Sequence, residues 1–150
     1  MAEFNLTQSE AEALIAMEKK RVEDKVVFFS GPEEGRLSIP LTSLDRRENF
    51  VLDATRYQIK LTKATFQNRA RKAIVLMRLD IDGPPHRNPD GEEIPCPHLH
   101  VYREGYADKW AHAAPAGSYP NTQDLFSTFL AFMNQCNIVD PPRVEKGLFS

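Results

Sequence analysis

The sequence predicts an α+β domain: an N-terminal helix, an antiparallel sheet or small barrel of about five or six strands, and a C-terminal helix packed on that sheet. Two observations support this class. Apolar residues recur at helical spacing near both ends of the chain. Between them, short apolar or alternating segments follow one another in quick succession, separated by short turns. Parallel strands need a helix-length connection, so this spacing favours antiparallel pairing.

The first helix is predicted from about Gln8 to Arg21. Thr7 and Glu10 have the spacing of a capping box, in which the Thr7 hydroxyl accepts from the Glu10 backbone N–H and the Glu10 side chain reaches back. Behind this cap, one helical face carries apolar residues, namely Ala11, Leu14, Ile15 and Val22.

The middle of the chain is typical of a sheet. The segment from Ala73 to Ile81 has the strongest strand pattern, and Pro40 indicates a strand end or an edge strand. The expected strands cover residues 26–29, 36–41, 50–52, 59–67, 73–81 and 98–103.

The last helix is predicted from about Gln123 to Cys136, with Asn121 or Thr122 as its N-cap. Its broad apolar face is expected to cover the sheet. The run Asp140-Pro141-Pro142 is expected to end the ordered part, so residues 1–150 form one domain with a core over about 5–140 and a loose tail over 141–150.

Composition narrows the class of protein. The chain has 150 residues, 41% of them hydrophobic, which suits one domain with a sizeable core. A formal net charge of −2 gives no global electrostatic argument for nucleic acid. Two cysteines without CxxC spacing exclude a disulfide framework and a cysteine-rich zinc module, so we expect a reducing, cytoplasmic setting. No apolar run approaches the roughly 20 residues that a membrane span needs.

The four histidines lie close together in the sequence, between residues 86 and 112. On the strand over 98–103, alternation places His98, His100 and Tyr102 on one face, while Leu99 and Val101 point to the core. Imidazoles and a phenol on one face can supply acid–base chemistry near neutral pH. The alternative is that these side chains only bond to their neighbours.

His86 precedes the turn signature Asn88-Pro89-Asp90-Gly91, which brings it near the start of that strand. It is therefore the candidate third member of a catalytic set with His98, His100 and Tyr102, whereas no alternation argument supports His112. A metal site is an alternative, with His86, Asp90 or His112 as a third ligand. Because the sequence has no HExxH motif and no cysteine pair, we expect no metal and no cofactor.

A basic stretch runs from Ala54 to Leu79 without an acidic residue. It contains seven cationic side chains: Arg56, Lys60, Lys63, Arg69, Arg71, Lys72 and Arg78. Tyr57 and Phe66 could stack on bases. The stretch is either a solvated or lysine-protected strand face or a row of phosphate donors. The candidate phosphate or nucleic-acid ligands are Lys63, Gln67, Arg69 and Arg78.

Three motifs stand out between residues 79 and 111: Leu79-Asp80-Ile81-Asp82-Gly83, His86 with Asn88-Pro89-Asp90-Gly91, and the run from His98 to Tyr106 with Asp108-Lys109-Trp110-Ala111. With these motifs the chain resembles an uncharacterised bacterial and prophage-associated family. The resemblance extends from the first helix to about residue 138 and is densest over residues 79–111. It implies a bacterial cytosol and mobile-element biology, where small toxins and inhibitors of host defence are common.

These observations favour a small domain that binds RNA or another phosphate-bearing ligand and cleaves it without a metal, as a ribonuclease of a toxin–antitoxin pair would. His98 and His100 would exchange protons, Lys63 and Arg69 would hold the phosphate, and Tyr102 would orient it. The competing hypothesis is a non-enzymatic, phage- or prophage-encoded anti-defence inhibitor that binds a bacterial protein complex. The protein partner would then be that complex, or an antitoxin in the first case. A histidine-based metal-binding domain is the third hypothesis.

Overall fold

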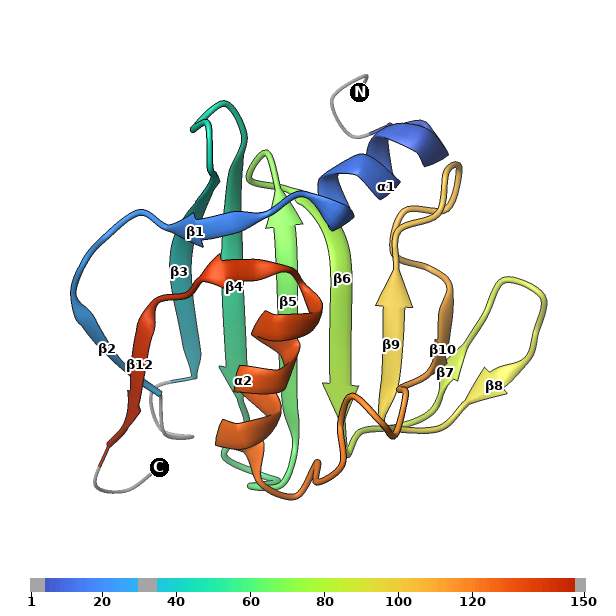
Figure 1. Ribbon diagram of the computed structural model, residues 1–150. Coiled ribbons are helices and arrows are strands. Elements are labelled where there is room, and N and C mark those ends of the chain that lie inside the picture. Colours follow the sequence, from blue (N-terminus) through green and yellow to red (C-terminus); the bar gives the residue numbers. More distant parts are fainter. Residues whose placement is uncertain (1–4, 30–34, 148–150) are drawn as a thin grey trace.

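The computed structural model describes residues 5–29 and 35–147, which form an α+β fold (Figure 1). Its elements are α1 (Gln8–Ala16), β1 (Lys19–Arg21), β2 (Val26–Phe29), β3 (Arg36–Ser43), β4 (Asn49–Arg56), β5 (Ala64–Ala70), β6 (Ile74–Ile81), β7 (His86–Arg87), β8 (Glu93–Ile94), β9 (His98–Val101), β10 (Ala111–Ala113), α2 (Leu125–Gln135), β11 (Ile138–Asp140) and β12 (Arg143–Lys146). Neither of these helices has the length and apolar character that a membrane crossing requires.

The main sheet has eight strands in the order β10-β9-β6-β5-β4-β3-β1-β11. Neighbouring strands are antiparallel, except that β1 pairs in parallel with β11. The sheet is therefore larger than the predicted five or six strands. The missed strands β1, β10 and β11 have three residues each, too few to show an alternating pattern.

Helix α1 begins with the predicted capping box, in which the Thr7 and Glu10 side chains each accept from the other residue's backbone N–H. It ends at Ala16 rather than at Arg21. The residues that were expected to continue the helix form β1, because pairing with β3 and β11 outweighs local helix propensity. Val22, assigned to the buried helical face, is 56% exposed.

Lys19 forms hydrogen bonds at the C-terminal ends of both α1 and α2. Its Nζ donates to the backbone carbonyls of Ile15 (3.0 Å), Met17 (2.8 Å) and Cys136 (2.8 Å). Burial lowers the pKa of Lys19 to about 8, while three carbonyl acceptors match the three N–H groups of the ammonium. This buried lysine therefore fixes the C-terminal ends of α1 and α2 against β1.

Helix α2 covers one face of the sheet (Figure 1). The Phe129 ring lies 4.9 Å from Phe66 of β5 and 5.4 Å from Phe29 of β2, between ring centroids. The N-cap is Asp124, whose carboxylate accepts from the Ser127 N–H, and not Asn121 or Thr122 as predicted. The predicted packing of a C-terminal helix on the sheet is confirmed.

Two other segments differ from the prediction. The strand expected over 59–67 begins at Ala64, and Ile59 is fully exposed in the preceding turn. Residues 143–146 were assigned to a loose tail but form β12, which pairs in parallel with β2. Residues 148–150 of that tail, and residues 30–34 of the expected core, lie outside the described residues.

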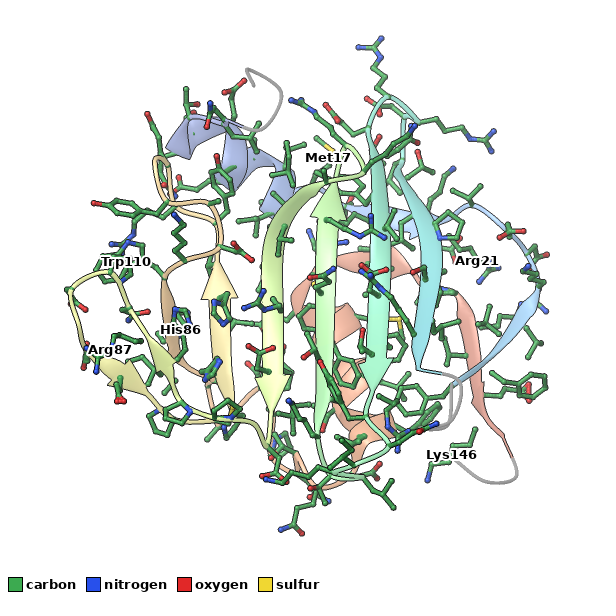
Figure 2. All side chains as sticks on the ribbon, turned by 180° about the vertical axis from the view of Figure 1, so that it is seen from behind. Met17, Arg21, His86, Arg87, Trp110 and Lys146 are labelled. Carbon is green, nitrogen blue, oxygen red and sulfur yellow. The ribbon has the colours of Figure 1, made fainter. Side chains whose placement is uncertain are left out.

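The sheet face opposite α2, seen in Figure 2, carries two rows of mostly polar side chains. The strand registers place Arg36, Thr55, Thr65, Asp80 and His98 in one row across β3, β4, β5, β6 and β9. They place Ser38, Asp53, Gln67, Arg78 and His100 in the next row. Antiparallel pairing thus gathers polar residues that are far apart in the sequence on one face.

Candidate functional site

Asp80 of β6 is the point where two histidines of β9 meet. Its Oδ2 lies 3.0 Å from Nε2 of His98 and 3.1 Å from Nε2 of His100. The Nδ1 atoms face backbone carbonyls, at 3.1 Å from Ile94 O and 2.8 Å from Asp108 O. A carbonyl oxygen and a carboxylate both only accept, so each ring has an acceptor at both of its nitrogens. A neutral ring carries one proton, and a proton on Nδ1 leaves a lone pair on Nε2.

The Asp80 carboxylate is held in a defined orientation. Its Oδ1 accepts from the Thr65 hydroxyl at 3.1 Å and lies 3.5 Å from Nε of Arg78, which leaves Oδ2 for the two imidazoles. Burial alone would raise the pKa of Asp80, but contacts with His100 and His98 and the charge of Arg78 outweigh it and hold the pKa at about 2. Asp80 is therefore ionised at neutral pH.

These three side chains could hold a metal ion. Nε2 of His98, Nε2 of His100 and one carboxylate oxygen of Asp80 lie within 4.8 Å of one another. Two imidazoles and a carboxylate form a ligand set that suits several divalent transition metals. In the described part of the chain, no other group of three such side chains meets the same geometry.

The third ligands considered from sequence do not complete this set. His86 lies beside it, with its ring centroid 4.5 Å from His100 and 5.9 Å from His98, and its Nε2 donates to the Lys109 carbonyl at 2.7 Å. His112 is exposed on β10, and Asp90 accepts from a backbone N–H within its turn. His86 thus joins the histidine cluster as predicted, and Asp80 is the candidate ligand that sequence reasoning missed.

The β7–β8 hairpin and β10 cover the histidines. The Asn88 amide donates to the Ala111 carbonyl and accepts from the Ala111 N–H, both at 2.9 Å. The predicted turn follows, with Gly91 at φ +92°, a conformation that favours glycine. Beneath this cover, His98 and His100 are 2% and 0% exposed.

Substitution Asn88→Ala is expected to lower the free energy of unfolding by roughly 2 kcal/mol, because both backbone groups of Ala111 lose their partner. The matched control is Asn121→Ala, whose side chain is exposed, and which should change stability by less than about 0.5 kcal/mol. Urea denaturation of both variants measures the difference. Equal effects would contradict the role assigned to Asn88.

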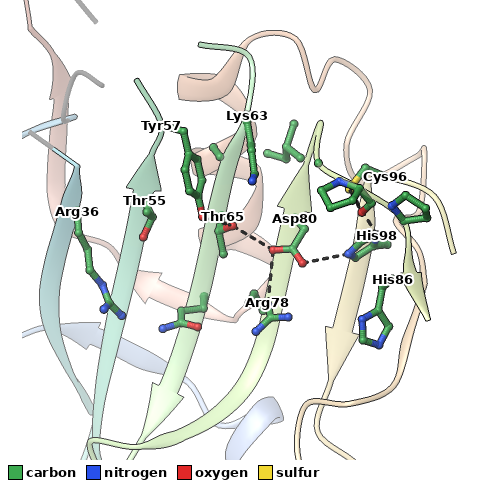
Figure 3. Close-up of a pocket in the computed structure, with 16 residues that line it drawn as sticks. Arg36, Thr55, Tyr57, Lys63, Thr65, Arg78, Asp80, His86, Cys96 and His98 are labelled. Carbon is green, nitrogen blue, oxygen red and sulfur yellow. Dashed lines mark hydrogen bonds and ion pairs between the residues drawn. The ribbon is translucent and has the colours of Figure 1, made fainter. Parts of the chain in front are cut away.

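A pocket of about 460 Å³ opens beside Asp80 and His98 (Figure 3). Its wall includes Lys63, Tyr57 and His86, and His100 lies behind it rather than on its surface. This volume is in the range of small-molecule sites. The candidate metal ligands Asp80 and His98 therefore face a space that a ligand could enter.

The candidate site lies within a segment that matches a family model. The model of a family of unknown function (DUF6978) covers residues 6–138. The chain belongs to this family. No curated protein and no solved structure matched the chain. The expected kinship with an uncharacterised domain family is thus confirmed.

A second carboxylate, Asp53 of β4, organises the neighbouring row in this DUF6978 chain. It is 1% exposed and accepts from Arg36 (2.8 Å), Ser38 (2.6 Å), Gln67 (2.8 Å) and Arg69 (2.6 and 3.1 Å). Burial would raise the pKa of Asp53, but these hydrogen bonds hold it far below its usual range. Arg69 does not line the pocket, so the structure does not place it for the predicted contact with phosphate.

The basic stretch contains no acidic residue in its sequence, but acidic residues from other segments contact it in the folded chain. Four of its cations pair with acids from elsewhere: Lys60 with Asp82, Arg69 with Asp53, Arg71 with Glu48, and Arg78 with Asp80 and Asp108. Of the predicted phosphate ligands, Lys63, Gln67 and Arg78 line the pocket. Lys63 stacks over the Tyr57 ring at 4.3 Å and forms no ion pair among the described residues.

Tyr102 is not on the histidine face, and its predicted position was wrong. Its hydroxyl accepts from the Leu6 N–H at 2.8 Å, and its ring belongs to the hydrophobic core. Strand β9 ends at Val101, so the alternation that was extended to residue 102 no longer applies there. Tyr102 therefore anchors the segment before α1 and takes no part in the pocket.

Cys96 lines the pocket next to His98. Its Sγ lies 3.5 Å from Nδ1 of His98, which is also 3.1 Å from the Ile94 carbonyl. Burial raises the pKa of the Cys96 thiol, so the thiol stays protonated at neutral pH. A protonated thiol is a weak nucleophile, and the geometry gives Cys96 a place in the wall rather than a chemical role.

Proposed function

We propose that this DUF6978 domain binds a divalent transition-metal ion through His98, His100 and Asp80 and presents it to a small ligand in the adjacent pocket. One observation carries the proposal. Two Nε2 atoms and one carboxylate oxygen converge, while both Nδ1 atoms are tied to backbone carbonyls. Hydrogen bonds at the far nitrogen are typical of metal-binding histidines, because they fix the tautomer and the ring orientation.

With the proton of each neutral ring on Nδ1, two Nε2 lone pairs face the Asp80 carboxylate, and this arrangement needs a positive partner. A proton at Nε2 would make an imidazolium, since Nδ1 already carries a proton, and burial lowers the pKa of His98 and opposes that state. Arg78 supplies one cation, with Nη2 at 3.1 Å from Nε2 of His100. Nε2 of His98 still faces Oδ2 of Asp80, where a metal ion would satisfy both atoms.

The position of the ligands favours a metal with open coordination sites. Three protein ligands leave room for water or a substrate, as in catalytic rather than structural metal sites. Asp80 and His98 line the pocket. The open sites would therefore face the space that a small molecule can occupy.

The metal-free ribonuclease hypothesis receives less support. His98 and His100 are buried, and the Nδ1 atom of each ring is hydrogen-bonded to a backbone carbonyl. A proton exchange with an RNA phosphodiester would require both rings to be reached from the pocket. RNA or a protein complex as partner, and a cytoplasmic location, stay predictions from the sequence.

The inhibitor hypothesis requires a surface that binds a protein complex. Trp110 is half-buried, with the Arg103 guanidinium 4.1 Å above its ring and Tyr106 edge-on at 5.7 Å. These contacts fix the Trp110 ring within the segment after β9 and indicate no particular partner. Binding to a defence complex likewise stays a prediction.

A zinc titration tests the proposal. Competition with a chromogenic chelator is expected to show about one Zn²⁺ per chain, and His98→Ala to weaken binding by roughly 100-fold or more. His112→Ala is the control, because His112 is exposed and its Nδ1 bonds to the neighbouring Ala113 carbonyl, away from the candidate ligands. Less than about 0.2 Zn²⁺ per wild-type chain, or equal loss in both variants, would overturn the proposal.

A further inference from the structure

The pocket wall on the β5 side carries a lysine that forms no ion pair with a carboxylate of residues 5–29 or 35–147. Lys63 stacks over Tyr57 at 4.3 Å, whereas Lys60, three positions earlier, pairs with Asp82 at 3.0 Å. The other cations of the wall form ion pairs: Arg36 pairs with Asp53, which it shares with Arg69, and Arg78 pairs with Asp80 and Asp108. Among the described residues, Lys63 is thus the cation of this wall that forms no ion pair.

Lys63 is connected to the candidate metal ligands by a chain of contacts (Figure 3). Its ammonium lies over the Tyr57 ring, the Tyr57 hydroxyl is 3.3 Å from the Thr65 hydroxyl, and that hydroxyl donates to Asp80 at 3.1 Å. The stem of Lys63 passes Gly83, where a Cβ would lie 3.4 Å from its Cε. These contacts hold the ammonium at the pocket rather than in bulk solvent.

The rest of the pocket wall, between Lys63 and the candidate metal ligands, indicates the kind of ligand that fits there. Pro84 and Pro85, which are exposed, and the Tyr57 ring contribute apolar surface, and Thr55 and Gln67 add hydrogen-bonding groups. A ligand that fits this wall has an organic body and an anionic group. A compact ammonium is a strong point-charge partner for phosphate and for carboxylate oxygens.

We propose that the pocket binds a small organic oxyanion, a phosphate monoester or a carboxylate, whose anionic group is recognised by Lys63. This inference deepens the proposed function, because the same molecule would face the metal held by His98, His100 and Asp80. Lys63 itself lies outside the metal ligand set. Binding of the anion and binding of the metal can therefore be measured separately.

The test uses phenyl phosphate, benzoate and neutral benzyl alcohol as probes in NMR titrations of the full chain, with and without Zn²⁺. At least one anion is expected to bind and to shift resonances of pocket residues, and benzyl alcohol is not. Lys63→Gln should weaken anion binding by roughly 10-fold or more. The relative affinities of the two anions distinguish phosphate from carboxylate recognition.

Lys60→Gln is the matched control, since it removes the same charge from a lysine outside this pocket wall. It should leave anion binding unchanged, and Lys63→Gln should leave the Zn²⁺ stoichiometry unchanged. Equal binding to wild type and Lys63→Gln, or no binding of either anion, would overturn the inference. Lys63-dependent anion binding by a chain that takes up no Zn²⁺ would support it while refuting the metal proposal.

Discussion

Zn²⁺ at about 100 times its dissociation constant is expected to raise the free energy of unfolding by roughly 2.7 kcal/mol. For a chain of this size the gain corresponds to an increase in Tm of about 5–10 °C. The reason is linkage: the ligand atoms on β6 and β9 converge in the folded chain and separate when the strands part. Differential scanning calorimetry with and without Zn²⁺ measures the shift.

Asp80→Asn is expected to abolish most of this stabilisation, because an amide is a poor ligand where a carboxylate oxygen is needed. Asp90→Asn is the control, since Asp90 is an exposed acid in the turn between β7 and β8. EDTA should return the wild-type Tm to its metal-free value. An equal Zn²⁺-dependent shift in wild type and Asp80→Asn would show that the metal binds elsewhere.

Replacement of Asp53 by alanine is expected to lower the free energy of unfolding by about 3–5 kcal/mol. The buried carboxylate is the shared partner of Arg36 and Arg69 and also accepts from Ser38 and Gln67. Its loss leaves two arginines, on the strands β3 and β5 that flank β4, without their counter-charge. Guanidinium denaturation of the variant and of wild type at pH 7 measures the cost.

The same carboxylate predicts a pH dependence. Because the pKa of Asp53 is lower in the folded chain than its ordinary value of 3.8, its contribution to stability is present above about pH 4 and is lost as the pH falls. Asp53→Ala should therefore differ most from wild type at neutral pH and less in acid. Asp140→Ala, at an exposed ion pair with Arg21, should cost at most about 1 kcal/mol. Equal costs would contradict the role of Asp53.

Local sequence signals predicted the elements that are long enough to carry a pattern. The capping box of Thr7 and Glu10, the apolar face of α2 and the strand over 74–81 have clear physical causes along the chain. The end of α1 was missed because Lys19 is drawn into the sheet by pairing with β3 and β11. Such pairing depends on partners far away in the sequence.

In the candidate site, too, local patterns predicted some residues, and long-range strand pairing placed the others. Alternation on β9 placed His98 and His100 on one face, and the turn after His86 brought that ring to them. Asp80 was missed because its position opposite His98 is a matter of strand register, which no local pattern contains. The sequence contained one indication of Asp80, namely an acidic residue near the end of the most apolar strand.

Charge was the least predictable property. The stretch from 54 to 79 contains no acid, yet Asp53 and Asp80 stand directly beside it in sequence and Glu48 and Asp108 reach it in space. Cross-strand neighbours decide which cations are neutralised. Lys63 is distinguished from the rest only by its aromatic partner and by the pocket it lines.

The most direct test of the central claim is X-ray absorption spectroscopy of the Zn²⁺-loaded chain. The expected shell contains two imidazole nitrogens at about 2.0–2.1 Å and carboxylate or water oxygens at about 2.0–2.2 Å, with no sulfur. In His100→Ala the imidazole scattering should fall by about half. A sulfur ligand at about 2.3 Å, which would implicate Cys96, or a spectrum without imidazole scattering, would contradict the account.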